Sequence, residues 1–288
     1  IFYKNNSKLL FVSDRSGTKN IYKSNLNYHD FLNKYELTNT SLLLNDFNYA
    51  INPRVSKSGT NISFVSNNAG NYDIYIYNEN DNNYSNLSMS KYKDYNQQFT
   101  PDGLSIIFQS LRGKNNNEII LKSLDGSLSI NLTAMEGDDL LSSHQSISNS
   151  GKFLVFSSNR DGDYEIYRMN LDGTNLVKLT NNDINDTSPV IDPSGESISY
   201  ISEKEGNYEI FLMDSWGSST KNISNSEFKD YNPLFSSNGD YISFLSDRDG
   251  NLEIYVVSTT GNFLKNISNN DRGDFDHKFV DDFIKWFP

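Results

Sequence analysis

A short motif recurs six times along the chain, and this repeat constrains the fold more than any other feature. The clearest copies are Tyr164-Glu165-Ile166-Tyr167, Tyr208-Glu209-Ile210-Phe211 and Leu252-Glu253-Ile254-Tyr255, and the isoleucine stands at Ile21, Ile74, Ile119, Ile166, Ile210 and Ile254. It recurs roughly every 45 residues, and a period of that length with several strands per unit is typical of a β-propeller. The sequence therefore predicts an all-β, six-bladed propeller, a single domain over residues 1–288 whose blades are centred on these isoleucines.

Each repeat unit divides into four short strands joined by tight turns. In the last full unit the expected strands are 232–236, 241–246, 253–257 and 264–268, with turns at Gly239, Gly250 and Gly261. Glycine supplies the positive φ that such turns need. The composition agrees, because aromatic residues reach 13% while alanine occurs only three times, and strands favour aromatic residues whereas helices favour alanine. We therefore expect four-stranded antiparallel blades.

Proline marks the first strand of a unit. Pro53, Pro189 and Pro233 occupy one column of the repeat, six residues before the turn glycine. Proline lacks the N–H that a central strand donates, so it fits an edge strand. The first strand of each blade is therefore predicted to be the edge that faces the channel of the propeller.

The end of the chain matches the start of a repeat. Residues 274–279 align with residues 230–235, whereas the first unit begins near Phe2 and lacks most of its first strand. We expect residues 274–280 to pair into the first blade and close the ring, which removes the exposed edges of an open array. Phe283 to Pro288 overrun this alignment, as an added strand or a docking tail. Since the chain begins with Ile1, it is expected to be a processed product or part of a larger chain.

The charge balance limits the partners. The chain has 25 Lys and Arg against 37 Asp and Glu, a formal net charge of −12, and binding to nucleic acid or to an anionic membrane rests on clustered basic residues. No run of residues approaches the roughly 18 apolar positions of a membrane span. The chain has no cysteine, which excludes disulfides, thiolate nucleophiles and cysteine-ligated metals. We therefore expect neither nucleic acid binding nor membrane insertion.

The motifs of the repeat resemble those of a known family. They comprise Ser246-Asp247-Arg248-Asp249-Gly250 and Ser158-Asn159-Arg160-Asp161-Gly162, then Thr100-Pro101-Asp102-Gly103 and Asp192-Pro193-Ser194-Gly195, then Leu37-Thr38, Leu132-Thr133, Leu179-Thr180 and Ile267-Ser268 at the end of the outer strand. On these motifs the chain resembles the TolB-like β-propeller repeat family over nearly its whole length. The α/β domain that precedes the propeller in TolB has no counterpart in the sequence.

The resemblance implies a non-enzymatic module for protein binding or scaffolding that acts in the periplasm or is otherwise exported. A protein or peptide partner is then expected, with the chain a monomer or part of a larger assembly. Related repeats also occur in the non-catalytic propellers of oligopeptidases and in some polysaccharide lyases, so the fold alone does not define an activity.

Three histidines are candidates for chemistry. His29 lies in a polar insertion of the first unit and is expected to be a solvated loop residue. The repeat column at the predicted channel mouth contains Asn52, Asn96, His144, Ser188 and Asn232, and His277 follows one column later beside Asp276. Two histidines on opposite sides of a channel suit a metal or acid–base site. Isolated polar residues in a wet channel are the simpler interpretation.

Carboxylates form a more regular pattern. Asp94, Asp186, Asp230 and Asp274 stand two residues before the channel column, and Ser142 and Ala50 take this place in the other two units. They lie on crossovers from an outer strand to the next inner strand, on the face that also holds the Ser-x-Arg-Asp-Gly turns. Capping of the crossover backbone explains each aspartate alone. Together they predict a site for a partner or for a divalent cation in the channel, such as calcium, which prefers oxygen ligands.

Two functions remain open. The first is a non-enzymatic protein-binding or scaffold module that binds a partner or a cation at the crossover face and channel mouth. The alternative is a carbohydrate-active enzyme, a lyase or hydrolase, with a channel site built from His144, His277 and nearby carboxylates. The two differ in geometry, because an enzyme needs titratable groups that converge on one point of a pocket.

Overall fold

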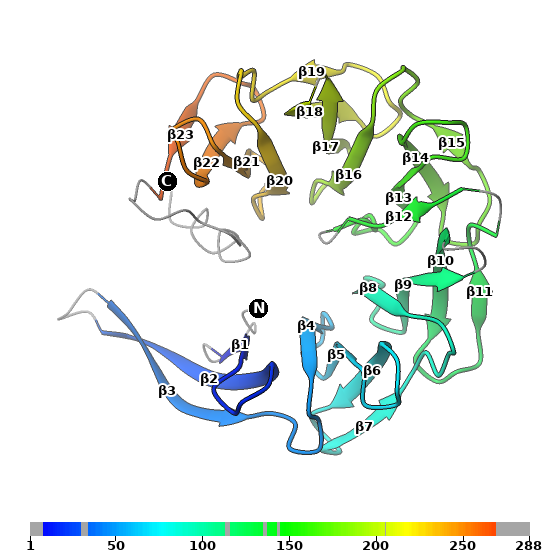
Figure 1. The fold of residues 1–288 in the computed structure, drawn as a ribbon, viewed down its shortest axis with the longest axis vertical. Helices are drawn as coiled ribbons and strands as arrows, with labels where there is room; N and C mark the ends of the chain where they lie inside the picture. The colour runs from blue at the N-terminus through cyan, green and yellow to red at the C-terminus, as the bar shows by residue number, and fades with distance from the viewer. Residues whose placement is uncertain are drawn as a thin grey trace. The chain divides into compact units, whose positions relative to one another are not determined.

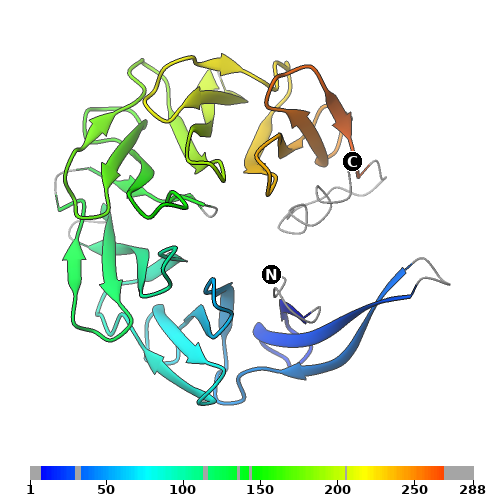
Figure 2. The ribbon, with the colours of Figure 1, turned by 180° about the vertical axis from the view of Figure 1, so that it is seen from behind.

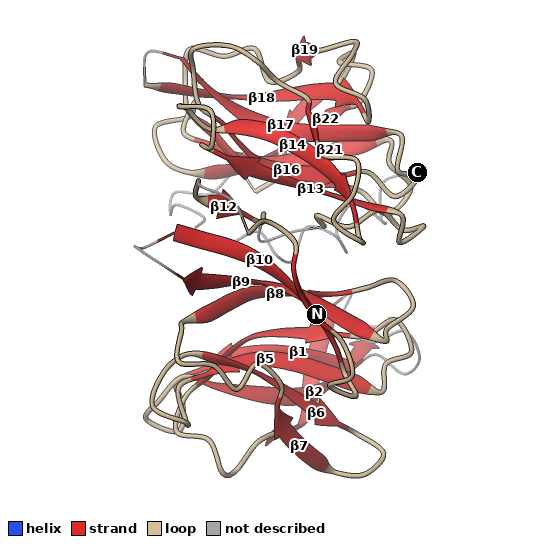
Figure 3. Cartoon of the chain, turned by 90° about the vertical axis from the view of Figure 1, so that its right-hand side faces the viewer, coloured by secondary structure: helices blue, strands red, loops and turns tan. Residues whose placement is uncertain are grey.

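The computed structural model consists of strands, turns and loops, with no helix among its described residues (Figure 3). It describes residues 8–29, 34–112, 116–134, 137–142, 145–204 and 206–268. Six antiparallel sheets follow one another along this part of the chain, five of them four-stranded. The predicted all-β, six-bladed propeller is confirmed. Since the described residues form no helix, none of them belongs to a helix that could span a membrane.

Residue contacts divide the chain into two compact units. Unit 1 consists of Ile1–Asn115 and Ile120–Ile130, and unit 2 of Asn116–Ile119 and Asn131–Pro288. The first three blades lie in unit 1, except for residues 116–119 and Asn131 of the third blade, and the last three blades lie in unit 2. That residues 1–288 behave as a single domain stays a prediction.

Unit 1 contains the blades drawn from dark blue to blue-green in Figure 1. The first blade has β1 (Lys8–Ser13), β2 (Asn20–His29) and β3 (Lys34–Leu42). The second has β4 (Ala50–Val55), β5 (Asn61–Ser66), β6 (Asp73–Asn78) and β7 (Asn83–Asn86). The third has β8 (Asp94–Phe99), β9 (Ser105–Arg112), β10 (Asn116–Ser123) and β11 (Ser129–Asn131).

Unit 2 contains the blades drawn from green to orange. The fourth blade has β12 (Asp139–Leu140), β13 (Phe153–Ser158), β14 (Glu165–Asn170) and β15 (Val177–Lys178). The fifth has β16 (Asp186–Ile191), β17 (Ser197–Lys204), β18 (Asn207–Asp214) and β19 (Lys221–Asn222). The sixth has β20 (Asp230–Phe235), β21 (Tyr241–Ser246), β22 (Glu253–Ser258) and β23 (Leu264–Asn266).

Within each blade the strands lie in chain order (Figure 2), and every strand pair whose register the structure describes is antiparallel. In unit 2 the first strands β12, β16 and β20 lie on one side of the row of blades, and the last strands β15, β19 and β23 on the other (Figure 1). The first strand is therefore an edge of its sheet, as the proline column predicted.

The first strand also carries a β-bulge that the sequence did not reveal. Its register with the second strand shifts between Ile51 and Arg54 in β4, and at the equivalent points of β8, β16 and β20. A bulge on an edge strand tolerates proline, because no ladder N–H is needed there. Pro53, Pro189 and Pro233 all lie at these bulges.

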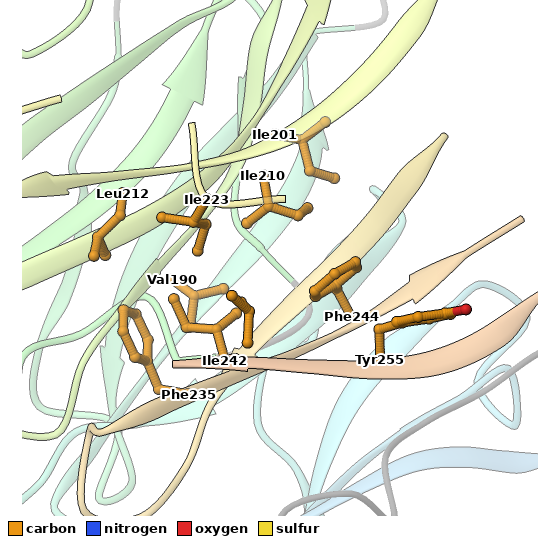
Figure 4. Close-up of a cluster of buried hydrophobic side chains, with 10 residues drawn as sticks. Val190, Ile201, Ile210, Leu212, Ile223, Phe235, Ile242, Phe244 and Tyr255 are labelled. Atoms are coloured by element: carbon orange, nitrogen blue, oxygen red, sulfur yellow. The ribbon is translucent and has the colours of Figure 1, made fainter. Parts of the chain in front are cut away.

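Within each unit the hydrophobic core lies between neighbouring sheets. The repeat isoleucines Ile21, Ile74, Ile119, Ile166 and Ile210 are completely buried. The side chains between the fifth and sixth blades come from both sheets; they are Val190, Ile201, Ile210, Leu212 and Ile223 from the fifth, and Phe235, Ile242, Phe244, Tyr255 and Val257 from the sixth (Figure 4). Burial of this apolar surface is the main favourable contribution to packing one blade on the next.

The insertion in the first unit lengthens a hairpin. His29 is the last residue of β2 rather than a loop residue, so that prediction was wrong. The N–H of Leu43 donates to the carbonyl oxygen of Ile21 at 2.9 Å, the contact that closes the outer strand in the other blades. Leu43, the residue directly after β3, therefore takes the place of Leu132 and Leu179 in the other blades. Leu37 and Thr38 were misassigned because the longer hairpin shifts the alignment.

The predicted closing strand, residues 274–280, lies outside the described residues, as do Phe283 to Pro288. The first blade has three strands among the residues that the structure describes. Closure of the ring by the end of the chain thus stays a prediction.

Candidate functional site

Each predicted crossover aspartate that the structure describes begins the first strand of its blade. Asp94, Asp186 and Asp230 open β8, β16 and β20, and their side chains are completely buried. Each pairs with a serine at or near the end of the second strand, as Asp94 does with Ser110. The aspartates thus lie beside the turn that joins the second strand to the third, at what we call the crossover end of the blade.

The fourth blade has the same aspartate, but not where the sequence predicted. Asp139 begins β12 and pairs with Ser158. The interval from this aspartate to the turn glycine, Gly151, is three residues longer than in the other blades, so counting back from the glycine gave Ser142 instead. His144, which lies outside the described residues, was assigned to its column by the same count.

In two blades an arginine of the turn neutralises this aspartate. Arg160 Nη2 lies 2.7 Å from Asp139 Oδ1, and Arg248 Nη2 lies 3.1 Å from Asp230 Oδ1. Each arginine also donates from Nε to the serine two residues before it, at 2.9 Å and 2.8 Å. Burial raises the pKa of both carboxyls, and the arginine opposes that rise. Charge-assisted hydrogen bonds of this kind tie the crossover to the turn.

Asp94 in the third blade has no such partner. Neither of its carboxylate oxygens accepts a hydrogen bond of ordinary geometry within the described chain, although the hydroxyls of Ser88, Ser90 and Ser110 lie nearby. Burial raises the pKa of Asp94, the three hydroxyls oppose the rise, and the negative charge of Asp73 adds to it. A buried carboxylate without a counter-charge destabilises the fold when it is ionised.

Asp186 in the fifth blade is intermediate. Its Oδ2 accepts a hydrogen bond from Asn182 Nδ2 at 2.8 Å, and its Oδ1 is buried without a partner in the described chain. Burial is the main cause that raises the pKa of Asp186, and the negative charge of Glu165 adds to it. One repeat position therefore holds either a paired or an uncompensated carboxylate, depending on the blade.

We expect Asp94→Asn to raise the free energy of unfolding near pH 8 by about 1 kcal/mol. Because the pKa of Asp94 is raised, the folded protein binds this proton more tightly than the unfolded chain does. Ionisation above the folded-state pKa thus destabilises the fold, and the amide variant avoids that cost. As the pH falls through the raised pKa the carboxyl becomes protonated, so the advantage of the variant should vanish below about pH 4. Urea unfolding at several pH values measures the difference.

Asp139→Asn is the matched control at the same repeat position. There the substitution removes the partner of Arg160, so we expect destabilisation near pH 8 instead of stabilisation. Equal losses of stability in the two variants would contradict the assignment of Asp94 as an uncompensated carboxylate.

The channel column occupies the bulge of the first strand. Asn52, Asn96, Ser188 and Asn232 have φ between 50° and 55°, in the left-handed region that asparagine tolerates better than most residues. Asn96 Nδ2 also donates to Gln109 Oε1 at 2.6 Å. Backbone conformation therefore accounts for the asparagines of this column, and their part in a binding site stays a prediction.

Four of the predicted site residues belong to segments that the structure does not describe. His144, Asp274, Asp276 and His277 lie outside the described residues. Within the described chain, no group of three or more histidine, aspartate or glutamate side chains is positioned to hold a metal ion. Calcium in the channel stays a prediction.

A latch that the sequence analysis missed joins the third strand to the outer strand. In the fourth blade, Thr180 Oγ1 donates to the buried carboxylate of Glu165 at 2.6 Å and accepts the N–H of Ile166 at 2.9 Å. Equivalent hydroxyls accept the N–H of Ile74, Ile119, Ile210 and Ile254 in the second, third, fifth and sixth blades. In the first blade the N–H of Ile21 donates to Asn20 Oδ1 instead. The signal was present, since each hydroxyl follows its isoleucine by 14 residues. The buried carboxylate of Glu165 thus accepts a hydrogen bond that holds the outer strand against the third strand.

The accessible groups at the crossover end are aromatic and basic. In unit 1, Tyr92 lies between two cations, with Lys91 Nζ 5.2 Å and the Arg112 guanidinium carbon 5.3 Å from its ring centre. Asn71 Nδ2 holds this crossover by donating to the carbonyl oxygens of Ser90 and Tyr92. We call Lys91, Tyr92, Lys93 and Arg112 the Tyr92 platform.

A second aromatic group lies at a crossover of unit 2. The rings of Tyr208 and Tyr231 are 5.4 Å apart, and Lys229 Nζ lies 5.7 Å from the ring centre of Tyr208. Phe228, which precedes the lysine, is 47% exposed. Partly exposed rings beside cations are groups that a partner can reach, unlike the buried aspartates.

Solved structures of known proteins share this β-propeller fold. The putative TolB from Agrobacterium tumefaciens aligns with a TM-score of 0.62 at 20% identity, covering 81% of this chain and 83% of that chain. TolB from Acinetobacter baumannii aligns with a TM-score of 0.63 at 18% identity, covering 93% and 65%. Oligogalacturonate lyase from Vibrio parahaemolyticus aligns with a TM-score of 0.66 at 13% identity, covering 92% and 75%. At these identities the likeness concerns the fold alone.

The family comparison is more specific. Residues 141–278 match the family model described as the TolB beta propeller domain. The resemblance to TolB-like repeats is thus confirmed for this part of the chain. No curated protein sequence matches the chain.

Proposed function

We propose that the chain is a non-enzymatic protein-binding module that engages a protein or peptide partner through the crossover ends of its blades and the channel mouth. The observation that carries the proposal is the Tyr92 platform, a partly exposed ring held between two cations on a crossover fixed by Asn71. Tyrosine and arginine are enriched at the centres of protein interfaces. A fixed crossover also loses little conformational freedom when a partner binds.

The placement of the carboxylates supports binding rather than catalysis. Asp94, Asp139, Asp186 and Asp230 are completely buried, and the acid of the latch, Glu165, is also enclosed. A catalytic carboxylate must reach its substrate within hydrogen-bond distance. The alternative of a carbohydrate-active enzyme depends on His144 and His277, so it stays a prediction. Export to the periplasm, which the likeness to TolB repeats supports, is part of the proposal.

Site-specific cross-linking tests this function. A photoreactive amino acid at position 92 or 228, in cells that produce the protein, should form adducts with a discrete protein partner. The same amino acid in place of Leu128 or Leu176 is the control, because these exposed residues lie away from the crossover end, in turns before an outer strand. Adducts at all four positions, or at none, would argue against a binding site on the crossovers.

A further inference from the structure

We propose that the Tyr92 platform binds a short acidic segment of the partner, two or more carboxylates next to an apolar side chain. This inference rests on the proposed function and names the chemistry that the platform recognises. Its basis is a difference between blades: Arg112 occupies the motif position of Arg160 and Arg248, but it does not neutralise the aspartate of its own blade.

Arg112 makes the hydrogen bond to the serine two residues before it, but not the ion pair with the buried aspartate of its blade. Its Nε donates to Ser110 Oγ at 3.0 Å, as the Nε of Arg160 does to Ser158. In the fourth and sixth blades the outer nitrogens then reach a buried aspartate. In the third blade the guanidinium lies over Tyr92 instead, and among the described residues no carboxylate is within ion-pair distance of it. Its outer nitrogens remain available to a carboxylate from a partner.

Two lysines complete the charge of the platform. Lys91 and Lys93 are exposed and stand on either side of Tyr92. Neither forms an ion pair with a carboxylate in the described chain. Three uncompensated cations therefore gather at one crossover of a chain whose formal net charge is −12. A local field of this sign favours an acidic segment.

The overall charge decides between the two kinds of polyanion. A nucleic acid presents an extended row of phosphates, and the net charge of −12 repels it beyond the platform. A short acidic peptide contacts only the platform, where the guanidinium can bind a carboxylate with two hydrogen bonds. The ring of Tyr92 offers an apolar surface to a neighbouring side chain of the peptide.

The sixth blade provides an internal comparison. Its crossover has Phe228 and Lys229 where the third blade has Tyr92 and Lys93. There, however, the arginine of the turn is engaged with its buried aspartate, and Glu227 takes the place of Lys91. This crossover thus has an aromatic residue with one accessible cation, and it should not bind acidic peptides.

The test is fluorescence anisotropy with labelled synthetic peptides. One peptide alternates glutamate and leucine, a second has lysine in place of glutamate, and a short DNA duplex is the third probe. We expect only the acidic peptide to bind, and its affinity to fall with added salt. The triple variant K91Q/K93Q/R112Q should weaken binding by about tenfold or more, as expected from the loss of three partly exposed ion pairs.

The control variant K57Q/K152Q/K265Q removes the same charge from exposed positions elsewhere. It should bind as the wild type does, and thermal unfolding establishes that both variants fold. Equal losses in the two triple variants, equal binding of the basic peptide, or tighter binding of DNA would overturn the inference. If the acidic peptide does not bind while cross-linking at positions 92 and 228 still captures a partner, this inference is wrong and the proposed function stands.

Discussion

Replacing Arg160 with methionine should lower the free energy of unfolding by about 3–5 kcal/mol, because the substitution leaves a buried charge unpaired. Asp139 is completely buried, and Arg160 Nη2 is its ion-pair partner at 2.7 Å. Methionine retains much of the apolar contact with Phe156 and Tyr167, over whose rings the guanidinium lies. The loss therefore reports mainly on the charge, and urea unfolding near neutral pH measures it.

The pH dependence distinguishes a lost ion pair from lost packing. Without the arginine, the pKa of Asp139 is raised further by burial, so the ionised form destabilises the variant above that pKa. As the pH falls and the carboxyl takes up its proton, the difference between variant and wild type should shrink. A difference that stays constant with pH would indicate a packing defect instead.

Arg112→Met is the matched substitution in the third blade. Arg112 has the same motif position, but no carboxylate of the described chain lies within ion-pair distance of it, so we expect a change within about 0.5 kcal/mol. A loss as large as that of Arg160→Met would mean that Arg112 stabilises the blade. It would also weaken the assignment of this side chain to partner binding.

Arg112 and Arg160 differ in a contact that the sequence alone does not predict. The periodic isoleucine and the turn glycines predicted six sheets with the correct strand order, because hydrophobic period and turn chemistry are local properties. Arg112 and Arg160 both follow a serine by two residues, and their Nε atoms make the same hydrogen bond. Their outer nitrogens differ because the ion pair joins residues far apart in sequence, whose separation depends on the folded crossover.

The two misassigned positions share one cause. Asp139 and Leu43 were missed because an insertion lies between each residue and the landmark used to align it. The sequence does not predict the β-bulge either. The φ near 50° at Asn52 follows from the register in which β4 pairs with β5, and not from the residue type alone. The latch through Thr180 could have been predicted from the sequence. A serine or threonine follows the repeat isoleucine by 14 residues in five blades, and a hydroxyl at that position can accept the buried N–H of the isoleucine.

The core between the fifth and sixth blades should be highly sensitive to truncation of a single side chain. Phe244 is completely buried, and its ring lies 6.0 Å from that of Tyr255 in a stacked pair. We expect Phe244→Ala to lower the free energy of unfolding by about 3–5 kcal/mol, since the sheets on both sides limit collapse of the cavity. Phe228→Ala, at a residue 47% exposed, should change it by no more than about 0.5 kcal/mol.

Hydrogen exchange should show which blades the Phe244→Ala substitution destabilises. Each blade of a repeat fold is stabilised by its nearest neighbours, so a defect between two blades should weaken those two first. In Phe244→Ala the backbone amides of β17, β18, β21 and β22 should exchange with deuterium faster than in the wild type, while those of β5 and β6 in unit 1 should change little. Uniform acceleration throughout both units would instead show that the blades unfold together, and that their stability cannot be assigned blade by blade.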